Sequence, residues 1–255
     1  SVNQKPMDLF VKEQLYRTPA SNYPTQLRDI ARSVLRTNDD ALNIEYIRDG
    51  QKFQRTIATY STEKIDIYKF YEDKDSCFKF VAKDIAYINN GTVKRKYLPE
   101  LWEHYKDTKG LIIDIRNYPS DFVLYQLGRY LVDKKSPFVK FTRGSLKQPG
   151  MFTFHKTNNV WRGKGKNYQG KVVILVNETT QSSAEFHAMA YQQAPNAVVM
   201  GSTTAGADGN VSSISLPGGI TTMISGIGVY YPDGRETQRV GIVPDIEVKP
   251  TIEGV

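Results

Sequence analysis

The fold is decided by one stretch of sequence, Val172-Val173-Ile174-Leu175-Val176-Asn177-Glu178-Thr179-Thr180-Gln181-Ser182-Ser183-Ala184-Glu185. A short apolar run typical of a buried strand ends at polar residues that can begin a helix. Residues 110–116 and 197–201 form two more such strands, and helices are expected over 98–108 and from Ser120. Strands that alternate with helices predict an α/β fold, with a mainly parallel sheet that helices cover on both faces.

The flanks of this core follow other patterns. Before residue 65 the sequence predicts a helix over 11–16, a second helix capped by Thr25 and running through Leu35, and a hairpin turned at Asp49-Gly50. We therefore divide the chain into a small α+β unit, 1–64, and a core domain, 65–255. Residues 143–170 are expected to form a long irregular loop, and the tail from Ile214 antiparallel ribbons.

Composition excludes several classes of function. The 255 residues carry a net charge of +7, but the basic residues are scattered, as in Lys94-Arg95-Lys96 and the looser set Arg162, Lys164 and Lys166. A nucleic-acid binder concentrates such residues on one face, so we expect no nucleic-acid partner, and at most a surface that favours acidic peptides.

No apolar run approaches the ~20 residues of a membrane span. Cys77 is the single cysteine and is expected to be a buried small hydrophobe, and no His/Cys spacing suggests a metal or cofactor.

Ser182 has two interpretations. Ser182 and Glu185 fit a capping box, in which the serine side chain accepts a backbone N–H and the glutamate reaches back. Alternatively, a serine at a helix N-terminus after a buried strand lies where free N–H groups favour negative charge, as an oxyanion hole requires. The residues alone leave both open.

Three motifs resemble those of the C-terminal processing (tail-specific) serine peptidases. Residues 177–185 resemble the pattern N-E-x-T-x-S-A-S-E, residues 114–121 are similar to D-L-R-N-N-P-G-G, and residues 230–245 resemble the closing Y-Y-T-P-x-G-R-x-I-Q-x-x-G-I-x-P-D. The likeness covers about 78–250. It implies a crotonase/ClpP-like core, a polypeptide substrate, and an acyl-enzyme formed on Ser182.

The resemblance also implies oxyanion donors. One is the backbone N–H of Ser183. The other comes from the turn at Ser120 or Asp121, where the family has glycine.

The general base departs from the family pattern. Ala207 stands where the bacterial enzymes carry the lysine of T-F-G-K-G, and Asp208 beside it is expected to be a weak base with a pKa near 4. The tricorn-type relatives, to which the chain is closer, use an upstream histidine oriented by an acidic group at the position of Gln238. We expect Gln238 to orient such an imidazole.

None of the three histidines is expected to be this base. His104 lies mid-helix on a solvated face, His155 in the irregular region, and His187 points away from Ser182 on the same helix. The first residues, Val2 to Met7, resemble the middle of a PDZ domain. We therefore expect a C-terminal fragment with a partial PDZ-like unit, nearly inert alone, whose missing upstream part supplies the histidine.

Two other functions remain open. Ala207, Gln238 and the absent glycines are compatible with a catalytically inactive peptide-binding or scaffold relative. The shared core is compatible with a crotonase-like acyl-thioester enzyme, although the closing motif favours a peptidase. By family resemblance alone we expect export to a bacterial periplasm or cell surface.

Overall fold

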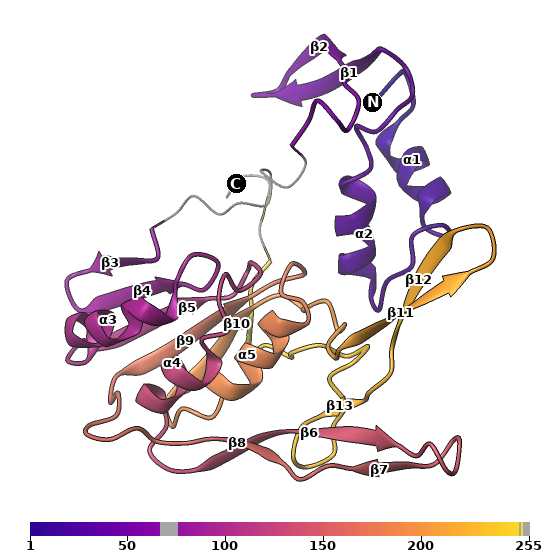
Figure 1. Cartoon of the computed structure of the whole chain (residues 1–255). Helices are drawn as coiled ribbons and strands as arrows, with labels where there is room; N and C mark the ends of the chain where they lie inside the picture. The colour runs from indigo at the N-terminus through magenta and orange to yellow at the C-terminus, as the bar shows by residue number, and fades with distance from the viewer. Residues whose placement is uncertain (67–75, 250, 252–255) are drawn as a thin grey trace. The chain divides into compact units, whose positions relative to one another are not determined.

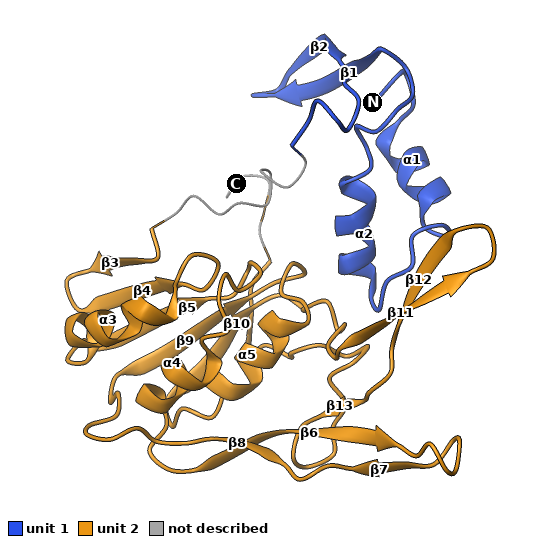
Figure 2. Ribbon diagram, in the orientation of Figure 1, with its two compact units in different colours: residues 1–73 blue, residues 74–255 orange. Residues whose placement is uncertain are grey.

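The computed structural model describes residues 1–66, 76–249 and 251. The chain forms two compact units, Ser1–Asp73 and Lys74–Val255 (Figure 2). The boundary between them falls among residues outside the described ones, nine positions after the 64/65 division expected from sequence. The two units are therefore described separately.

Unit 1 contains helices α1 (Met7–Gln14) and α2 (Tyr23–Ala31) and the antiparallel pair β1 (Ala41–Arg48) and β2 (Gln51–Ala58). The hairpin prediction is confirmed, because Asp49 (φ 50°) and Gly50 (φ 73°) take the left-handed conformation of a tight turn. The cap prediction is wrong: Asn22 caps α2 by accepting the Thr25 N–H, and α2 ends at Ala31 rather than Leu35. The PDZ-like character of this unit stays a prediction.

Unit 2 is built on a six-stranded sheet in the order β14-β10-β9-β5-β4-β3 (Figure 1). Its strands are β3 (Phe78–Ala82), β4 (Ile85–Asn89), β5 (Gly110–Asp114), β9 (Lys171–Val176), β10 (Ala197–Gly201) and β14 (Ile246–Glu247). All neighbours are parallel except the edge strand β3, which is antiparallel to β4. The predicted α/β fold with a mainly parallel sheet is confirmed.

Helices α3 (Leu98–Tyr105), α4 (Leu124–Leu131) and α5 (Ser183–Tyr191) lie together in front of the sheet in Figure 1, and η2 (Arg95–Tyr97) precedes α3. In β9, Val172, Ile174 and Val176 are buried, whereas Val173 and Leu175 are half-buried. Within the described residues the helices therefore cover one face rather than the expected two. The helix expected from Ser120 begins only at Leu124.

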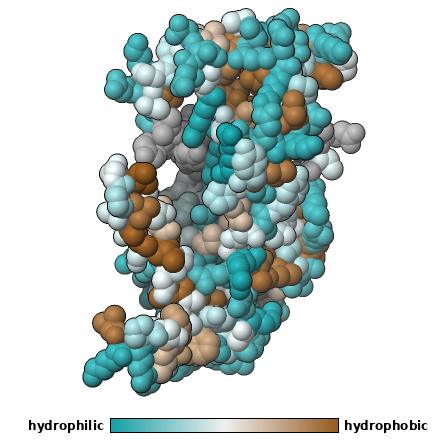
Figure 3. Space-filling view, turned by 90° about the vertical axis from the view of Figure 1, so that its right-hand side faces the viewer, coloured by the Kyte–Doolittle hydropathy of each residue, from teal (hydrophilic) through white to brown (hydrophobic). Residues whose placement is uncertain are grey.

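Two antiparallel ribbons extend from this core. In the first, β6 (Ser136–Gly144) pairs with β7 (Phe152–Phe154), β8 (Asn158–Val160) and β13 (Val229–Tyr230). Residues 143–170 are thus not one irregular loop, because two short strands within them pair with β6. In the second, β11 (Val211–Leu216) pairs with β12 (Ile220–Ser225), which confirms the predicted ribbon. On the face shown in Figure 3, hydrophobic side chains lie in separate groups among hydrophilic ones.

Candidate active site

Ser182 sits in a strained turn between β9 and α5. Its backbone angles are φ 54° and ψ −116°, a conformation that non-glycine residues rarely adopt, and the helix begins at the next residue. Such strain persists only where surrounding contacts hold it, and it is concentrated at functional sites. A sharp strand-to-helix turn of this kind exposes a nucleophilic side chain.

Two threonines tie this turn to the end of the neighbouring strand. The Thr179 hydroxyl donates to the Arg116 carbonyl and the Thr180 hydroxyl to the Ile115 carbonyl, each at 2.7 Å. The motifs at 114–121 and 177–185, far apart in sequence, therefore meet at the carboxyl ends of β5 and β9. This is the edge of a parallel sheet where ligands usually bind.

Glu185 joins the nucleophile turn to the loop after β10. Its buried carboxylate accepts four hydrogen bonds: from the N–H groups of Ser182 (3.0 Å), Gly206 (2.7 Å) and Ala207 (3.0 Å), and from the Thr204 hydroxyl (2.6 Å). Burial raises the pKa of Glu185, and these four bonds oppose that rise. Glu185 is thus both the capping residue of α5 and the link to the next loop.

The closing motif packs on that same loop. The Ile242 N–H donates to the Thr204 hydroxyl oxygen at 2.7 Å. Gly241 has φ 79°, and a Cβ there would lie 2.5 Å from the Thr204 oxygen, so glycine is required by both conformation and space. The closing motif is therefore linked to the Ser182 turn through Thr204 and Glu185.

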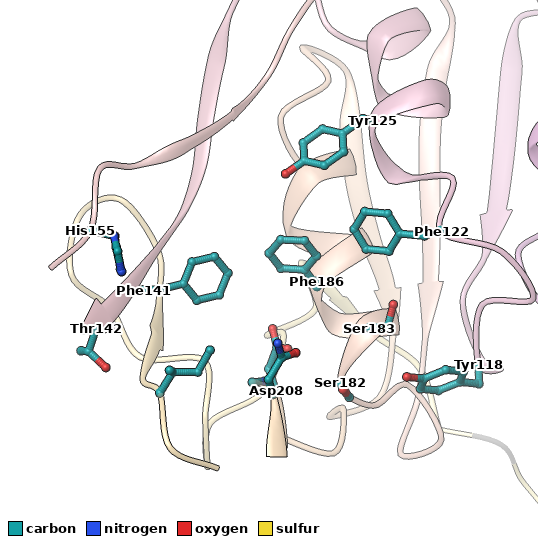
Figure 4. A pocket seen from close by; sticks show the side chains of 13 residues that line it. Tyr118, Phe122, Tyr125, Phe141, Thr142, His155, Ser182, Ser183, Phe186 and Asp208 are labelled. Atoms are coloured by element: carbon teal, nitrogen blue, oxygen red, sulfur yellow. The ribbon is translucent and has the colours of Figure 1, made fainter. Parts of the chain in front are cut away.

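A pocket of about 680 Å³ opens beside the turn. Figure 4 shows Ser182 and Ser183 on one side and Phe141 and His155 on the other, with Phe186 between them. The remaining lining residues are Tyr118, Phe122, Tyr125, Thr142, Asp208, Gly209, Asn210 and Ile227. Its volume and mainly apolar walls are typical of a ligand pocket.

Asp208 is a buried carboxyl in this pocket. It is 5% exposed, its Oδ1 accepts the Gly209 N–H at 2.7 Å, and its Oδ2 has no hydrogen-bond partner within the described residues. Burial raises its pKa to about 7, helped by the nearby Glu185 charge. The expectation of a pKa near 4 is therefore wrong. Sequence reasoning missed this because burial depends on segments distant in the chain.

Comparison with known proteins decides the class. The sequence profile of peptidase family S41 matches residues 65–248. The chain belongs to this family. Ser182, in its strained turn beside the pocket, lies within the matched residues.

The chain is similar in sequence to a curated protein and in fold to solved structures. A protein of Staphylococcus haemolyticus named "Probable CtpA-like serine protease" is 23% identical over 97% of this chain, which spans only 51% of that protein. Mature CPAF complexed with lactacystin has a TM-score of 0.71 at 12% identity, covering 97% of this chain and 72% of that one. The photosystem II D1 C-terminal processing protease has a TM-score of 0.51 at 18% identity, covering 90% and 62%. This chain thus spans about half the length of the curated relative, and the solved structures share its fold.

Gln238 of this S41 domain is not among the residues that line the pocket. Its Nε2 donates to the carbonyls of Asp208 (2.8 Å) and Ile227 (2.9 Å), and its Oε1 accepts the Val229 N–H at 3.3 Å. Both ends of the amide are therefore taken by backbone groups. In this arrangement Gln238 positions the segments that carry Asp208 and Ile227.

The expected oxyanion donors differ in availability. The Ser183 N–H makes no hydrogen bond within the described residues, whereas the Ser120 N–H donates to the Asn90 carbonyl at 3.1 Å. The Asp121 N–H is free of such a bond in the described part of the chain. Ser120 and Asp121 lie between Tyr118 and Phe122, which line the pocket, but do not line it themselves.

The turn around these donors is anchored from the segment before α3. Lys94 Nζ donates to the Ser120 carbonyl at 2.7 Å, and the Arg95 N–H donates to the Asp121 carboxylate at 2.9 Å. The Arg95 N–H bond lowers the pKa of Asp121. These contacts explain why α4 begins only after the turn.

The three histidines lie in different environments. His104 is exposed on α3, as predicted. His187 is buried, its Nδ1 lies 2.6 Å from the Ser183 carbonyl oxygen, and burial lowers its pKa to about 4, so it is a neutral structural residue at neutral pH. His155 is exposed and lines the pocket opposite Ser182, where Phe141 and Phe186 lie between them (Figure 4).

Within the described residues, no three or more His, Cys, Asp or Glu side chains group as metal ligands would. None of the helices in this part of the chain has the length and apolar character of a membrane span.

Proposed function

We propose that this chain carries the nucleophilic half of a serine endopeptidase that works through an acyl-enzyme on Ser182. The strained conformation of Ser182 at the mouth of the pocket is the observation that supports this role. Its Oγ would bond to the substrate carbonyl carbon while the hydroxyl proton passes to a base. Collapse of the tetrahedral intermediate would break the C–N bond, the protonated amine would leave, and water would hydrolyse the ester.

The charge that develops on the carbonyl oxygen needs donors. The unbonded N–H of Ser183, at the start of α5, is the first. The Asp121 N–H is the second in this proposal, in preference to Ser120, whose N–H is already donated to Asn90.

We propose that the general base comes from a segment outside these 255 residues. Ala207 occupies the lysine position of the bacterial enzymes, and His187 is neutral and bonded to Ser183. His104 does not line the pocket, and His155 lines it on the side opposite Ser182, beyond Phe141 and Phe186. The pocket is open to such a group, and the chain spans only about half of its curated relative. On this proposal the 255-residue chain is nearly inert alone.

Asp208 is the second candidate for the proton acceptor. Its Oδ2 is free within the described residues, it lines the same pocket as Ser182, and a pKa of about 7 suits a base at neutral pH. If Asp208 accepts the Ser182 proton and returns it to the leaving amine, the chain needs no further residue.

A fluorophosphonate probe tests these assignments. We expect the longer protein that contains this chain to be labelled, the Ser182→Ala variant not to be, and the 255-residue chain to react slowly. Rapid labelling of the chain alone, abolished by Asp208→Asn, would replace the external base by Asp208. No labelling of the intact, folded longer protein would favour the scaffold function.

Two further experiments test the remaining alternatives. Saturable binding of coenzyme A would favour an acyl-thioester enzyme. Export to a periplasm or cell surface rests on the family alone, and fractionation of the native cells tests it.

A further inference from the structure

A second cleft, of about 620 Å³, lies beside the active-site pocket in unit 2. Trp102 of α3 and residues 125, 126, 129 and 130 of α4 form one side, and residues 161–164 form the other. Nothing in the proposed reaction uses it.

The walls of this cleft are held in place by backbone and ring contacts. The Gly163 N–H donates to the Arg129 carbonyl at 2.8 Å, and the Tyr168 N–H donates to the Tyr130 carbonyl at 2.7 Å. The Trp102 and Tyr130 rings are stacked with centroids 4.8 Å apart. The segment after β8 is thus fastened to α4, and the cleft is formed before any ligand arrives.

Positive charge lines this cleft without a carboxylate to balance it. Arg129, Arg162 and Lys164 are exposed lining residues, and none forms an ion pair within the described residues. Arg162 is partly engaged, since its Nη2 donates to the Gly165 carbonyl at 2.8 Å. The buried Oε1 of Gln126 has no donor partner in the described part of the chain. A suitable ligand therefore brings negative charge and an N–H donor to the same place.

Tyr125 connects the two cavities, because it lines both the cleft and the pocket that holds Ser182. Figure 4 shows its ring at the edge of that pocket, above Phe122 and Phe186. Because the two cavities share this wall residue, they are neighbours, and a chain seated at Ser182 would reach the cationic cleft by passing Tyr125.

We propose that this cleft binds a carboxylate-bearing stretch of the substrate polypeptide. This inference rests on the proposed peptidase function, since continuity with the Ser182 pocket is what makes a polypeptide the occupant. The carboxylate would pair with Arg129 and Lys164, a peptide N–H would reach Gln126, and a flanking side chain would pack on the exposed ring of Trp161. The carboxylate comes either from Asp or Glu side chains or from the chain terminus.

Binding to the 255-residue chain carrying Ser182→Ala tests this without cleavage. Fluorescence anisotropy would compare an acidic peptide, capped as an amide, with its Asn/Gln counterpart, and a neutral peptide ending in a free carboxylate with its amide. We expect the carboxylate form of at least one pair to bind about tenfold more tightly, the effect of one or two partly exposed ion pairs. The pair that responds identifies the source of the carboxylate.

Substitutions that remove positive charge test whether the carboxylate preference arises in the cleft. Arg129→Gln/Lys164→Gln should abolish the preference, whereas Lys83→Gln/Lys147→Gln, which removes two exposed charges outside the cleft, should retain it. Thermal unfolding of both pairs checks that they fold. Equal affinity for acidic and neutral peptides, or equal effects of the two variant pairs, overturns the inference. So does cleft-dependent binding of a single-stranded oligonucleotide in preference to the acidic peptide.

The inference and the proposed function fail in different experiments. If the probe labels Ser182 but the protein shows no preference for carboxylate peptides, the peptidase proposal stands and the assignment of the cleft is wrong. If the protein prefers carboxylate peptides but no probe labels it, the cleft assignment stands and the peptidase proposal fails. That result would indicate a peptide-binding relative.

Discussion

The carboxylate of Glu185 accepts the backbone N–H of Ser182 at 3.0 Å and holds the strained residue from within its own helix. The same carboxylate accepts donors from Thr204, Gly206 and Ala207. A capping box is usually a local device of one helix. Here it also fixes the distance between the nucleophile turn and the loop that carries Asp208, so one side chain sets the shape of the site.

Glu185→Gln should destabilise unit 2 by about 2 kcal/mol, because the amide retains one acceptor oxygen and turns an NH₂ group toward backbone donors. Glu185→Ala should cost about 3 kcal/mol or more, since two buried and two part-buried donors lose their partner. Urea unfolding measures both. Glu100→Gln on the exposed surface of α3 is the control, and an equal effect of both Gln substitutions would contradict the role of Glu185.

Local patterns predicted much of this fold and the place of its site. The apolar runs of β5, β9 and β10 and the Asp49-Gly50 turn are strong short-range signals. Parallel strands bring their carboxyl ends to one edge, so motifs that follow β5 and β9 had to meet.

Features set by distant contacts could not be predicted in this way. α4 begins late because Lys94 and Arg95 hold the preceding turn. The sequences of β7 and β8 show no clear alternation of apolar and polar residues, and these strands form because they pair with β6. The pKa of Asp208 depends on burial, which no residue adjacent in sequence reports.

Asp208 should make stability depend on pH. The folded protein retains the Asp208 proton up to about pH 7, whereas the unfolded chain releases it near the ordinary pKa of 3.8. Between these values the folded state binds more protons, so stability falls as pH rises and stays reduced above pH 7. The difference amounts to at most about 4 kcal/mol.

Asp208→Asn should remove that dependence, because the amide mimics the neutral acid. We expect the variant to match the parent at about pH 4 and to exceed its stability at about pH 8. Denaturant unfolding at the two pH values measures this. A variant that is less stable at about pH 8 than the parent would mean that the folded protein stabilises the ionised form.

Gln238→Glu introduces the acidic residue that the sequence resemblance implies at this position in tricorn-type peptidases, yet we expect it to harm this protein. The carboxylate would face the carbonyls of Asp208 and Ile227, which now accept the amide N–H groups, at a cost of about 3 kcal/mol. Thermal unfolding and probe labelling of the longer protein should both fall, whereas exposed Gln148→Glu should change neither. Faster labelling by Gln238→Glu would instead support direct orientation of a base by this position.

The strain at Ser182 predicts that glycine at this position gives a more stable fold than alanine, although both substitutions remove the nucleophile. Ser182→Ala removes the hydroxyl but keeps the Cβ, whereas Ser182→Gly removes both and relieves the φ 54° conformation. Relief of such strain exceeds the entropic cost of glycine, so Ser182→Gly should be about 1 kcal/mol more stable than Ser182→Ala. At Ser183, the first residue of α5, the order should reverse, because glycine is the poorer helix former there by about 0.5–1 kcal/mol. Urea unfolding of the four variants measures both differences, and neither Ser182 variant should react with the probe. If alanine is the more stable residue at both positions, the turn stores no strain and the serine is held there by the capping box alone.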